Sequence, residues 1–600
     1  MKRLAVIAGT AAISIVFILR FEPSRLLLAE SVPPAIAALI VLLAALGCGR
    51  FALRVVRSVD APLSDVLLIG FATFGTLSAA LALMSTAFVP PFAITLAGIE
   101  AFFLGRDRVR FAWPHLHPLL AIAIGIAFIA AIVPVNSPDE LVYKLSIPHA
   151  WQLYGRMIEL PLNSHSYLAM ALQCADIAAL ALGGGIAAKL AHFGIYVAVI
   201  AVVRRIGGDW AAIALAFTPA LMIIAGWAWS EWGVLGLLLV SYDRWSRDDA
   251  NGGACALGCA IASKYTALPW LLAVLVIALS SRALGRNPDG WTARKDIAPP
   301  LFPRSSLTLG ATLRPLIIIA AFGAFFYVRN VIWTGSPIAP LLLPHAPQVS
   351  DYRGSAWLGV IRGDDIFDAR IVDESLGIIL PLAFIAGLFA WRRRRDLVLI
   401  GLIQMPILLT IGPGSRNIIN GVAPIAIAGM SLLEEMMPLG VVFAIPLVAQ
   451  LTLVSFTLES YDFLPYLAGR ENATQYIART RSFAQPYDWI ARHTPRDARV
   501  LVLAENRTFY LQRRFVAAGN LDSERVNAWL AGGALDREHF THIIIHKSWY
   551  QVGTRPVGTI EKEYVLQVTP ATHQKVMQFL AGRAKLQYQD AQYVIYECAK

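Results

Sequence analysis

Long apolar runs separated by short polar segments fill the first three quarters of the chain. Runs of roughly 17–25 apolar residues are long enough to cross a bilayer as helices. The pattern therefore predicts a polytopic α-helical membrane protein with about 13–15 membrane segments. The expected spans are residues 4–19, 33–49, 66–88, 89–105, 118–135, 186–203, 210–227, 231–243, a hairpin over 254–280, 315–333, 375–391, 397–412, 418–433 and 438–457.

The pattern changes after residue 457, where helical and strand periodicities alternate. Helices are expected over 486–493, 523–530 and 571–580, and strands over 499–504, 542–546 and 592–596. Alternation of this kind is typical of a small α/β layer domain. A C-terminal α/β domain is thus predicted over residues 458–600.

Composition and charge narrow the class further. Of the 600 residues, 57% are hydrophobic and 15% are charged, which excludes an ordinary soluble enzyme. Lys and Arg gather in alternate loops, and this bias marks the cytoplasmic side. It predicts a cytoplasmic N-terminus held by a retained first helix, with the loop after residue 135 and the tail after 457 outside. The net charge of +11 mostly reflects these inner loops, so it does not require nucleic-acid binding.

Two adjacent carboxylates, Asp139 and Glu140, follow Pro138 where the fifth apolar segment meets the outer water. An ionisable residue at a membrane rim is a candidate functional residue, although a solvated loop would also place acids there. Glu231 occupies a short outer turn, Trp227 to Trp232, and is a possible acid/base or metal-binding partner. An acid that caps a helix N-terminus would look the same.

Positive charge on the outer side is the second signal, because the usual bias disfavours it there. The outer cations are Lys144, Arg156, Lys264, Arg329, Arg353, Arg362, Arg370 and Arg416. Several cations beside carboxylates indicate a site for a phosphate or diphosphate headgroup. For Lys264 alone, snorkelling to the interface is the competing explanation. A second acidic group, Asp364, Asp365 and Asp368, fits a solvated loop or an acceptor-side element.

These segments together resemble the membrane glycosyltransferases of the C superfamily, in particular bacterial relatives of protein mannosyltransferases and lipid A aminoarabinose transferases. The matching elements are Asp139-Glu140 with Tyr143-Lys144-Leu145 and Pro148-His149, Ser263-Lys264-Tyr265-Thr266, Arg329-Asn330 with Thr334-Gly335-Ser336-Pro337, and Ser415-Arg416-Asn417. The resemblance covers residues 118–457, so residues 1–117 are expected to add extra transmembrane helices. Lys144 stands where the family has His, and Asn417 where it has an aromatic residue.

The resemblance implies an enzyme of the cytoplasmic membrane that transfers a sugar from a polyprenyl-phosphate carrier to a lipid, glycan or protein acceptor on the outer face. Catalytic roles fall to Asp139 as the base, Glu140 and Glu231. The residues expected to bind substrate are Tyr143, Lys144, His149, Lys264, Tyr265, Arg329, Asn330 and Arg416, with Lys264, Arg329 and Arg416 on the donor phosphate. A divalent cation held by Asp139 and Glu140 is left open.

Two other functions stay open at this stage. A transporter or lipid flippase would share the many spans, but such proteins tend to show internal repeats and charges near the bilayer midplane. No repeat is visible here, and the charges gather at the outer rim. A catalytically silent assembly partner of cell-envelope synthesis is the third reading.

Overall fold

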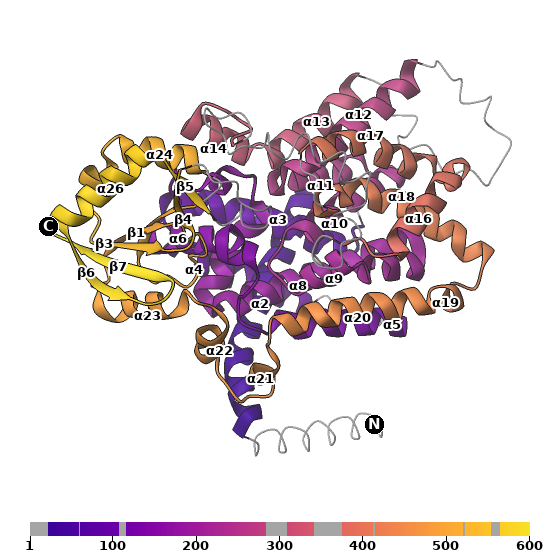
Figure 1. Cartoon of the computed structure of the whole chain (residues 1–600). Coiled ribbons are helices and arrows are strands. Elements are labelled where there is room, and N and C mark those ends of the chain that lie inside the picture. Colours follow the sequence, from indigo (N-terminus) through magenta and orange to yellow (C-terminus); the bar gives the residue numbers. More distant parts are fainter. Residues whose placement is uncertain are drawn as a thin grey trace.

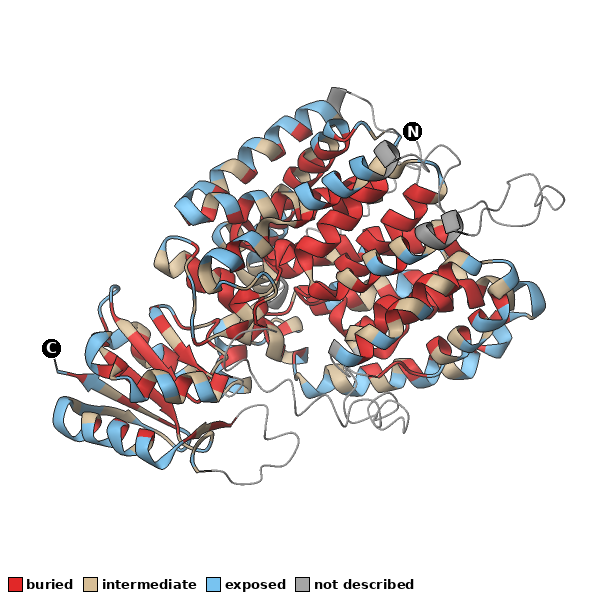
Figure 2. Cartoon of the chain, turned by 90° about the horizontal axis from the view of Figure 1, so that it is seen from above, coloured by how far each residue is buried: buried red, intermediate tan, exposed pale blue. Residues whose placement is uncertain are grey.

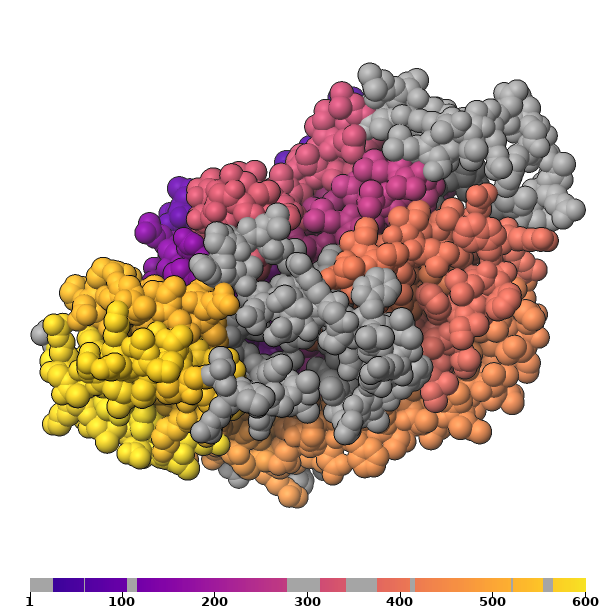
Figure 3. Space-filling model, turned by 45° about the horizontal axis from the view of Figure 1, so that its top comes forward, coloured from indigo at the N-terminus to yellow at the C-terminus, as the bar shows by residue number. Residues whose placement is uncertain are grey.

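The structure, a computed structural model, describes residues 22–58, 60–106, 116–283, 309–340, 375–411, 415–519, 522–553 and 565–599. A large helical body carries a smaller α/β domain at one end, formed by the C-terminal part of the chain (Figures 1 and 3). The expected first span at 4–19, the outer arginines 353, 362 and 370, and the acids 364, 365 and 368 lie outside the described residues.

The helices before residue 132 are α2 (Glu22–Val55), α3 (Leu63–Met84), α4 (Val89–Arg106) and α5 (Pro118–Ala131). Glycines let α2 and α3 touch backbone to backbone. A Cβ on Gly49 would lie 1.9 Å from the carbonyl oxygen of Val66, and one on Gly70 would lie 1.8 Å from that of Ala45. Close approach through small residues is the usual way in which membrane helices associate. Helices α2 and α3 therefore pack as one unit.

The remaining helices of the body are α8 (Asp176–Ala216), α9 (Pro219–Ile224), α10 (Glu231–Ser246), α11 (Ala250–Ser263), α12 (Leu268–Ala283), α13 (Leu309–Gly323), α14 (Phe325–Thr334), α16 (Ile379–Phe389), α17 (Arg395–Ile411), α18 (Ser415–Met436), α19 (Leu439–Val442) and α20 (Ala444–Ser460). Figure 2 shows their inner faces buried and many of their outer faces exposed, as expected where lipid replaces water. Helix α8 runs through 41 residues, but its backbone is non-helical at Gly184 and Gly208. The break at Gly208 falls between the predicted spans 186–203 and 210–227, as expected, whereas the helix after it ends at Ala216, before Pro219.

Among the described residues, five helices are long and apolar enough to cross a membrane: Arg25–Val55, Leu63–Met84, Thr86–Leu104, Asp176–Ala216 and Arg416–Met436. The pair α13 and α14, bent by 58°, makes a sixth if it is one span, and five more apolar helices have 10–17 residues. The expected hairpin over 254–280 consists of two short helices that meet at Lys264. The protein is thus a polytopic helical membrane protein, with several apolar helices shorter than a full span.

The segment between α5 and α8 is built from short elements, and we call it the outer segment because the sequence predicts it to lie outside. They are a π-helical turn η2 (Glu140–Lys144), α6 (Ser146–Tyr154), η3 (Ser164–Tyr167) and α7 (Ala171–Cys174). Single π-helical turns are rare and often occur at functional sites. This one carries the predicted acids.

The C-terminal domain contains the α/β alternation that the sequence predicts. Its elements are α21 (Leu464–Leu467), α22 (Ala473–Thr480), α23 (Ala484–His493), β1 (Arg499–Leu503), β2 (Arg514–Ala518), α24 (Ser523–Ala531), α25 (Ala534–Arg537), β3 (His542–His546), β4 (Tyr550–Val552), β5 (Leu566–Val568), α26 (Pro570–Arg583), β6 (Ala584–Gln589) and β7 (Tyr593–Cys598). The main sheet has the order β2-β1-β3-β7-β6, in which β1 runs parallel to β2 and β3 and antiparallel pairs link β3 to β7 and β7 to β6.

This domain packs directly on the outer segment that bears the acids. The Arg481 guanidinium donates to the carbonyl of Asn136 at 2.6 Å, and the Asn136 amide donates to the Tyr476 hydroxyl at 2.6 Å. Tyr510 donates to the carbonyl of Val135 at 2.8 Å. The domain therefore holds the chain just before Asp139.

Candidate functional site

Asp139 stands at the start of the π-helical turn, with its side chain 23% exposed. The Tyr143 hydroxyl donates to Oδ2 at 2.8 Å, and Nη1 of Arg416 donates to the same oxygen at 3.0 Å. The Tyr143 ring is in turn stacked on His165, with ring centroids 4.2 Å apart. Both partners bind Oδ2, so Oδ1 is the oxygen of Asp139 that is better placed to meet a substrate.

Glu231 is buried at the first turn of α10, where the helix dipole favours negative charge. The Lys144 ammonium binds both of its oxygens, at 2.9 and 2.8 Å, and the Lys264 ammonium binds Oε1 at 2.8 Å. Two ammonium groups therefore occupy this carboxylate. In the structure this carboxylate holds two cations in place. The acid/base or metal-binding role of Glu231 stays a prediction, to which helix capping was the alternative.

Trp229 connects the two ion-paired groups. The Arg416 guanidinium carbon lies 4.6 Å from the centre of the indole, and the Lys144 ammonium lies 4.5 Å from it. Cations at this distance from an aromatic ring are attracted by its quadrupole. The sequence draws attention to the Trp227–Trp232 turn for its acid, but it gives no sign that Trp229 would contact cations that come from other segments.

We call the six residues Asp139, Tyr143, Lys144, Glu231, Lys264 and Arg416, together with Trp229, the rim cluster. Its charged members come from helix ends: Glu231 begins α10, Lys264 follows the end of α11, and Arg416 lies in the first turn of α18. Counted over the members of the rim cluster alone, three cationic side chains meet two carboxylates, a balance of one positive charge.

Exposure divides the rim cluster into an inner and an outer part. The side chains of Lys144 and Glu231 are 1% and 3% exposed, whereas those of Lys264 and Arg416 are 25% and 24% exposed. A ligand that arrives from outside would therefore meet Lys264, Arg416 and Asp139. The excess positive charge at this open part suits an anion.

Glu140 does not share the partners of Asp139. It is fully buried, and it accepts from the backbone N–H of Ala228 at 2.7 Å and from the Ser137 hydroxyl at 2.8 Å. Its carboxylate thereby ties the outer segment to the turn that carries Trp229.

The arrangement does not fit a divalent cation shared by Asp139 and Glu140. The Arg416 guanidinium and the Tyr143 hydroxyl both donate to Oδ2 of Asp139. The carboxylate of Glu140 accepts from a backbone N–H and from a hydroxyl. In the part of the chain that the structure describes, no three His, Cys, Asp or Glu side chains come together as a metal site.

Tyr265, Arg329 and Asn330 form a separate, buried group. The Asn330 amide donates to the carbonyl of Tyr167 at 2.6 Å and to the Tyr265 hydroxyl at 2.8 Å. The Arg329 guanidinium donates to the carbonyl of Leu168 at 3.1 Å and lies over the Trp333 ring at 4.7 Å. In the structure these three residues hold the segment that follows η3, beside His165.

His149 lies away from the rim cluster, at the contact with the C-terminal domain. Its Nε2 is 3.2 Å from the carbonyl oxygen of Leu511, and its ring lies beside Phe509. Burial lowers the pKa of His149 to about 4, and burial likewise lowers the pKa of His165 to about 4. Both imidazoles are therefore neutral at physiological pH.

Asn417 is a further neighbour that the sequence treats only as a departure from a family pattern. Its side-chain oxygen lies 3.5 Å from the Lys264 ammonium, which already binds Glu231. Its position directly after Arg416 is the one signal in the sequence that could have identified it.

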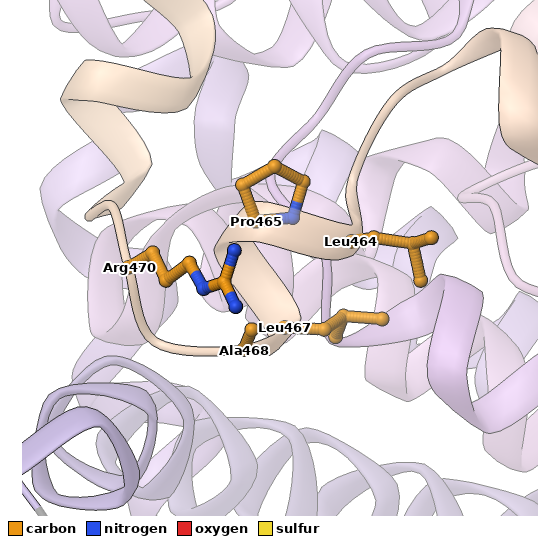
Figure 4. Close-up of a pocket in the computed structure, with 5 residues that line it drawn as sticks. All are labelled: Leu464, Pro465, Leu467, Ala468 and Arg470. Atoms are coloured by element: carbon orange, nitrogen blue, oxygen red, sulfur yellow. The ribbon is translucent and has the colours of Figure 1, made fainter.

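A pocket at the start of the C-terminal domain is lined by Leu464, Pro465, Leu467, Ala468 and Arg470 (Figure 4). Its lining comes from α21 and the residues that follow it, and it contains no member of the rim cluster. It is therefore distinct from the site described above.

No protein-family model matches the chain, and neither does any curated protein. Among solved structures, the chain is similar to ArnT from Cupriavidus metallidurans bound to undecaprenyl phosphate, with 14% identity, a TM-score of 0.46, and coverage of 80% of this chain and 97% of that one. It is also similar to the arabinofuranosyltransferase AftD from Mycobacteria, with 15% identity, a TM-score of 0.40, and coverage of 80% and 40%. An Archaeoglobus fulgidus oligosaccharyltransferase tethered with an acceptor peptide matches with 13% identity, a TM-score of 0.34, and coverage of 80% and 74%.

Proposed function

We propose that this protein is a membrane glycosyltransferase of the C superfamily type, which transfers a sugar from a polyprenyl-phosphate carrier to an acceptor hydroxyl on the outer face of the cytoplasmic membrane. The observation that carries the proposal is the contact of Arg416 with Asp139, at 3.0 Å, in the partly exposed part of the rim cluster. A cation that is able to bind phosphate and a carboxylate that is able to act as a base stand side by side there.

The donor phosphate is assigned to Arg416 and Lys264. When the bond from the anomeric carbon to the carrier breaks, negative charge grows on the phosphate oxygens, so fixed cations stabilise the transition state more than the ground state. Lys144 adds positive charge from the buried side while Glu231 holds both ammonium groups. Arg329 contacts backbone and aromatic rings, and its proposed part is to shape the site near η3.

Asp139 is assigned as the base. Its Oδ1 takes the proton of the acceptor hydroxyl, the acceptor oxygen forms a bond to the anomeric carbon, and the carrier leaves as polyprenyl phosphate. A donor phosphate on Arg416 competes with Asp139 for the guanidinium and so weakens the ion pair when the base is needed. Glu231 is less suited to this role because two ammonium groups already bind it.

A transporter or flippase is the competing proposal. Transporters tend to consist of internal repeats, and no repeat is visible in the sequence. This favours a transferase, which works where a lipid headgroup meets a soluble or membrane-bound acceptor.

The deciding experiment uses the purified full chain in detergent with radiolabelled polyprenyl-phosphate sugars and a panel of acceptors. We expect release of the free carrier by the wild type and its loss in Asp139→Asn. Movement of intact donor across a proteoliposome membrane without carrier release would support the transporter. Equal carrier release by the wild type and by Asp139→Asn would contradict the assignment of Asp139 as the base.

A further inference from the structure

We propose that Trp229 is a positioning residue, whose indole holds Arg416 and Lys144 at the donor site, and that Ser137 and a buried His192–Asp176 pair fix its orientation. The inference rests on the proposed function for its catalytic consequence. The geometry that supports it stands without that function.

The first step is the contact of one ring with two cations. Arg416 begins one helix and Lys144 ends the π-helical turn, and both lie within 4.6 Å of the same indole centre. Two like charges at one ring repel each other, and among aromatic rings the face of an indole attracts cations most strongly. Trp229 is 3% exposed, so little water screens these attractions.

The second step is how the indole itself is held. Its Nε1 donates to the Ser137 hydroxyl at 3.2 Å, and that hydroxyl donates to Glu140 at 2.8 Å. Glu140 also accepts from the backbone N–H of Ala228, the residue before the tryptophan. Glu140, which the sequence predicts to be catalytic, is thus linked to Arg416 and Lys144 only indirectly, through Ser137 and Trp229.

A buried pair of side chains on α8, His192 and Asp176, contacts the backbone of Trp229. His192 Nδ1 is 3.2 Å from the carbonyl oxygen of Trp229, and its Nε2 is 3.1 Å from Oδ2 of Asp176. A carbonyl oxygen only accepts, so Nδ1 carries a proton. The contact between Nε2 and Oδ2 then needs a second proton, on one atom or the other. The pair carries no net charge in either arrangement, as suits its complete burial.

Substitutions separate this role from simple packing. Trp229→Leu removes the aromatic face and Trp229→Phe keeps a weaker one. Ser137→Ala keeps the indole but removes the hydroxyl that links it to Glu140. Asp176→Ala breaks the bond to His192, whereas Asp176→Asn can donate to Nε2 and should restore it. The matched control is Trp232→Leu, because Trp232 is also buried and donates to a backbone carbonyl, that of Leu221, at 2.8 Å.

Two measurements test the inference. The first is the dissociation constant for undecaprenyl phosphate in detergent, with inorganic phosphate in a parallel series to separate the headgroup from the lipid. We expect Trp229→Leu to weaken binding roughly tenfold or more, Trp229→Phe and Ser137→Ala to weaken it less, and Asp176→Asn and Trp232→Leu to stay near the wild type.

The second measurement needs no donor: the thermal stability of Trp229→Leu, Arg416→Ala and the double variant. Residues in contact show non-additive effects in such a cycle. Additive effects would overturn the inference, and so would unchanged lipid binding in Trp229→Leu when Arg416→Ala loses it. If the wild type itself neither binds the lipid nor transfers sugar, the proposed function fails while the stability cycle still decides the role of Trp229. If Trp229→Leu does not fold, the same cycle is run with Trp229→Phe.

Discussion

Arg416 and Asp139 are 277 residues apart in sequence, yet Nη1 of the arginine lies 3.0 Å from Oδ2 of the aspartate. The contact joins the first turn of α18 to the π-helical turn η2. The same guanidinium also lies over the ring of Trp229. In the proposed function, donor binding and proton transfer are therefore connected through this one side chain.

Asp139→Asn should abolish transfer and leave donor binding intact. The amide cannot take the acceptor proton, and a positioned base contributes about 10²–10⁴-fold in rate. Donor affinity should hold or rise, because Arg416 loses the anion that competes with the phosphate. Turnover and dissociation constants check this, with Asp462→Asn as the control, since that aspartate is exposed and paired with Arg479. Full turnover in Asp139→Asn would contradict the assignment.

Arg416→Lys and Lys264→Ala should both weaken donor binding. A hydrogen bond to a charged group contributes about 1.5–3 kcal/mol, or roughly 10- to 150-fold in affinity. The lysine at 416 keeps the charge but loses the planar fork that binds phosphate and stacks on an indole. Arg492→Lys, an exposed arginine paired within its own helix, is the matched control. Wild-type donor affinity in both variants would contradict the phosphate assignment, and the ammonium of Lys264 would then serve only to reach the membrane interface.

Stability should fall as the pH drops from about 7 to 4. Burial lowers the pKa of His149 to about 4 in the folded protein, against an unfolded value of 6.5. Between these values the unfolded chain binds a proton that the folded chain excludes, so the free energy of unfolding rises with pH there. Over this pH range, the shifted pKa of His149 should lower the free energy of unfolding by on the order of 3 kcal/mol. His149→Phe should flatten the pH profile of the melting temperature, while His493→Phe, an exposed site, should not. An unchanged slope in His149→Phe would contradict this account.

Arg481→Ala should lower the rate of transfer although residue 481 contacts no member of the rim cluster through a described hydrogen bond. Its guanidinium holds the carbonyl of Asn136, three residues before Asp139, at 2.6 Å. Loss of this bond should reduce kcat more than it raises KM for the donor, and should cost about 1.5–3 kcal/mol of stability. Arg492→Ala in the same domain is the control. An effect confined to the melting temperature would make the contact purely structural.

Residues 458–600 are expected on the outer side, and cysteine labelling of whole cells can check this. All five native cysteines are buried, so they give little background, and Cys598 itself is a poor reporter. Asp497→Cys, at an exposed position of the C-terminal domain, should react with an impermeant reagent, and Arg54→Cys, exposed at the end of α2, should not. The reverse pattern would invert the topology and the placement of the site.

The features that could be predicted from the sequence are those that depend on a local pattern of residues. Apolar runs identify the helices, and charges at a membrane rim are conspicuous, so six members of the rim cluster could be named in advance. Pairings could not be read in this way, because Lys144 meets Glu231 across 87 positions. Neighbouring acids gave no clue that Glu140 turns toward a backbone N–H while Asp139 meets Arg416. In the C-terminal domain, strands β2 and β6 were not predicted. They are the edge strands of the sheet, and each carries charged residues, such as Arg514 and Lys585, which weaken the strand pattern.

The hydrogen bond from Asn136 to Tyr476 spans 340 positions, and that distance orders the events of biosynthesis. A ribosome makes the acid-bearing segment long before it makes the partners that hold that segment in place. If Asp139 is the base that we propose, it reaches its working geometry only after the chain through residue 510 has been synthesised and has folded against it. A chain that ends between residues 416 and 476 would carry every charged side chain of the rim cluster, and we expect it to be inactive because it lacks the partners that hold Asn136.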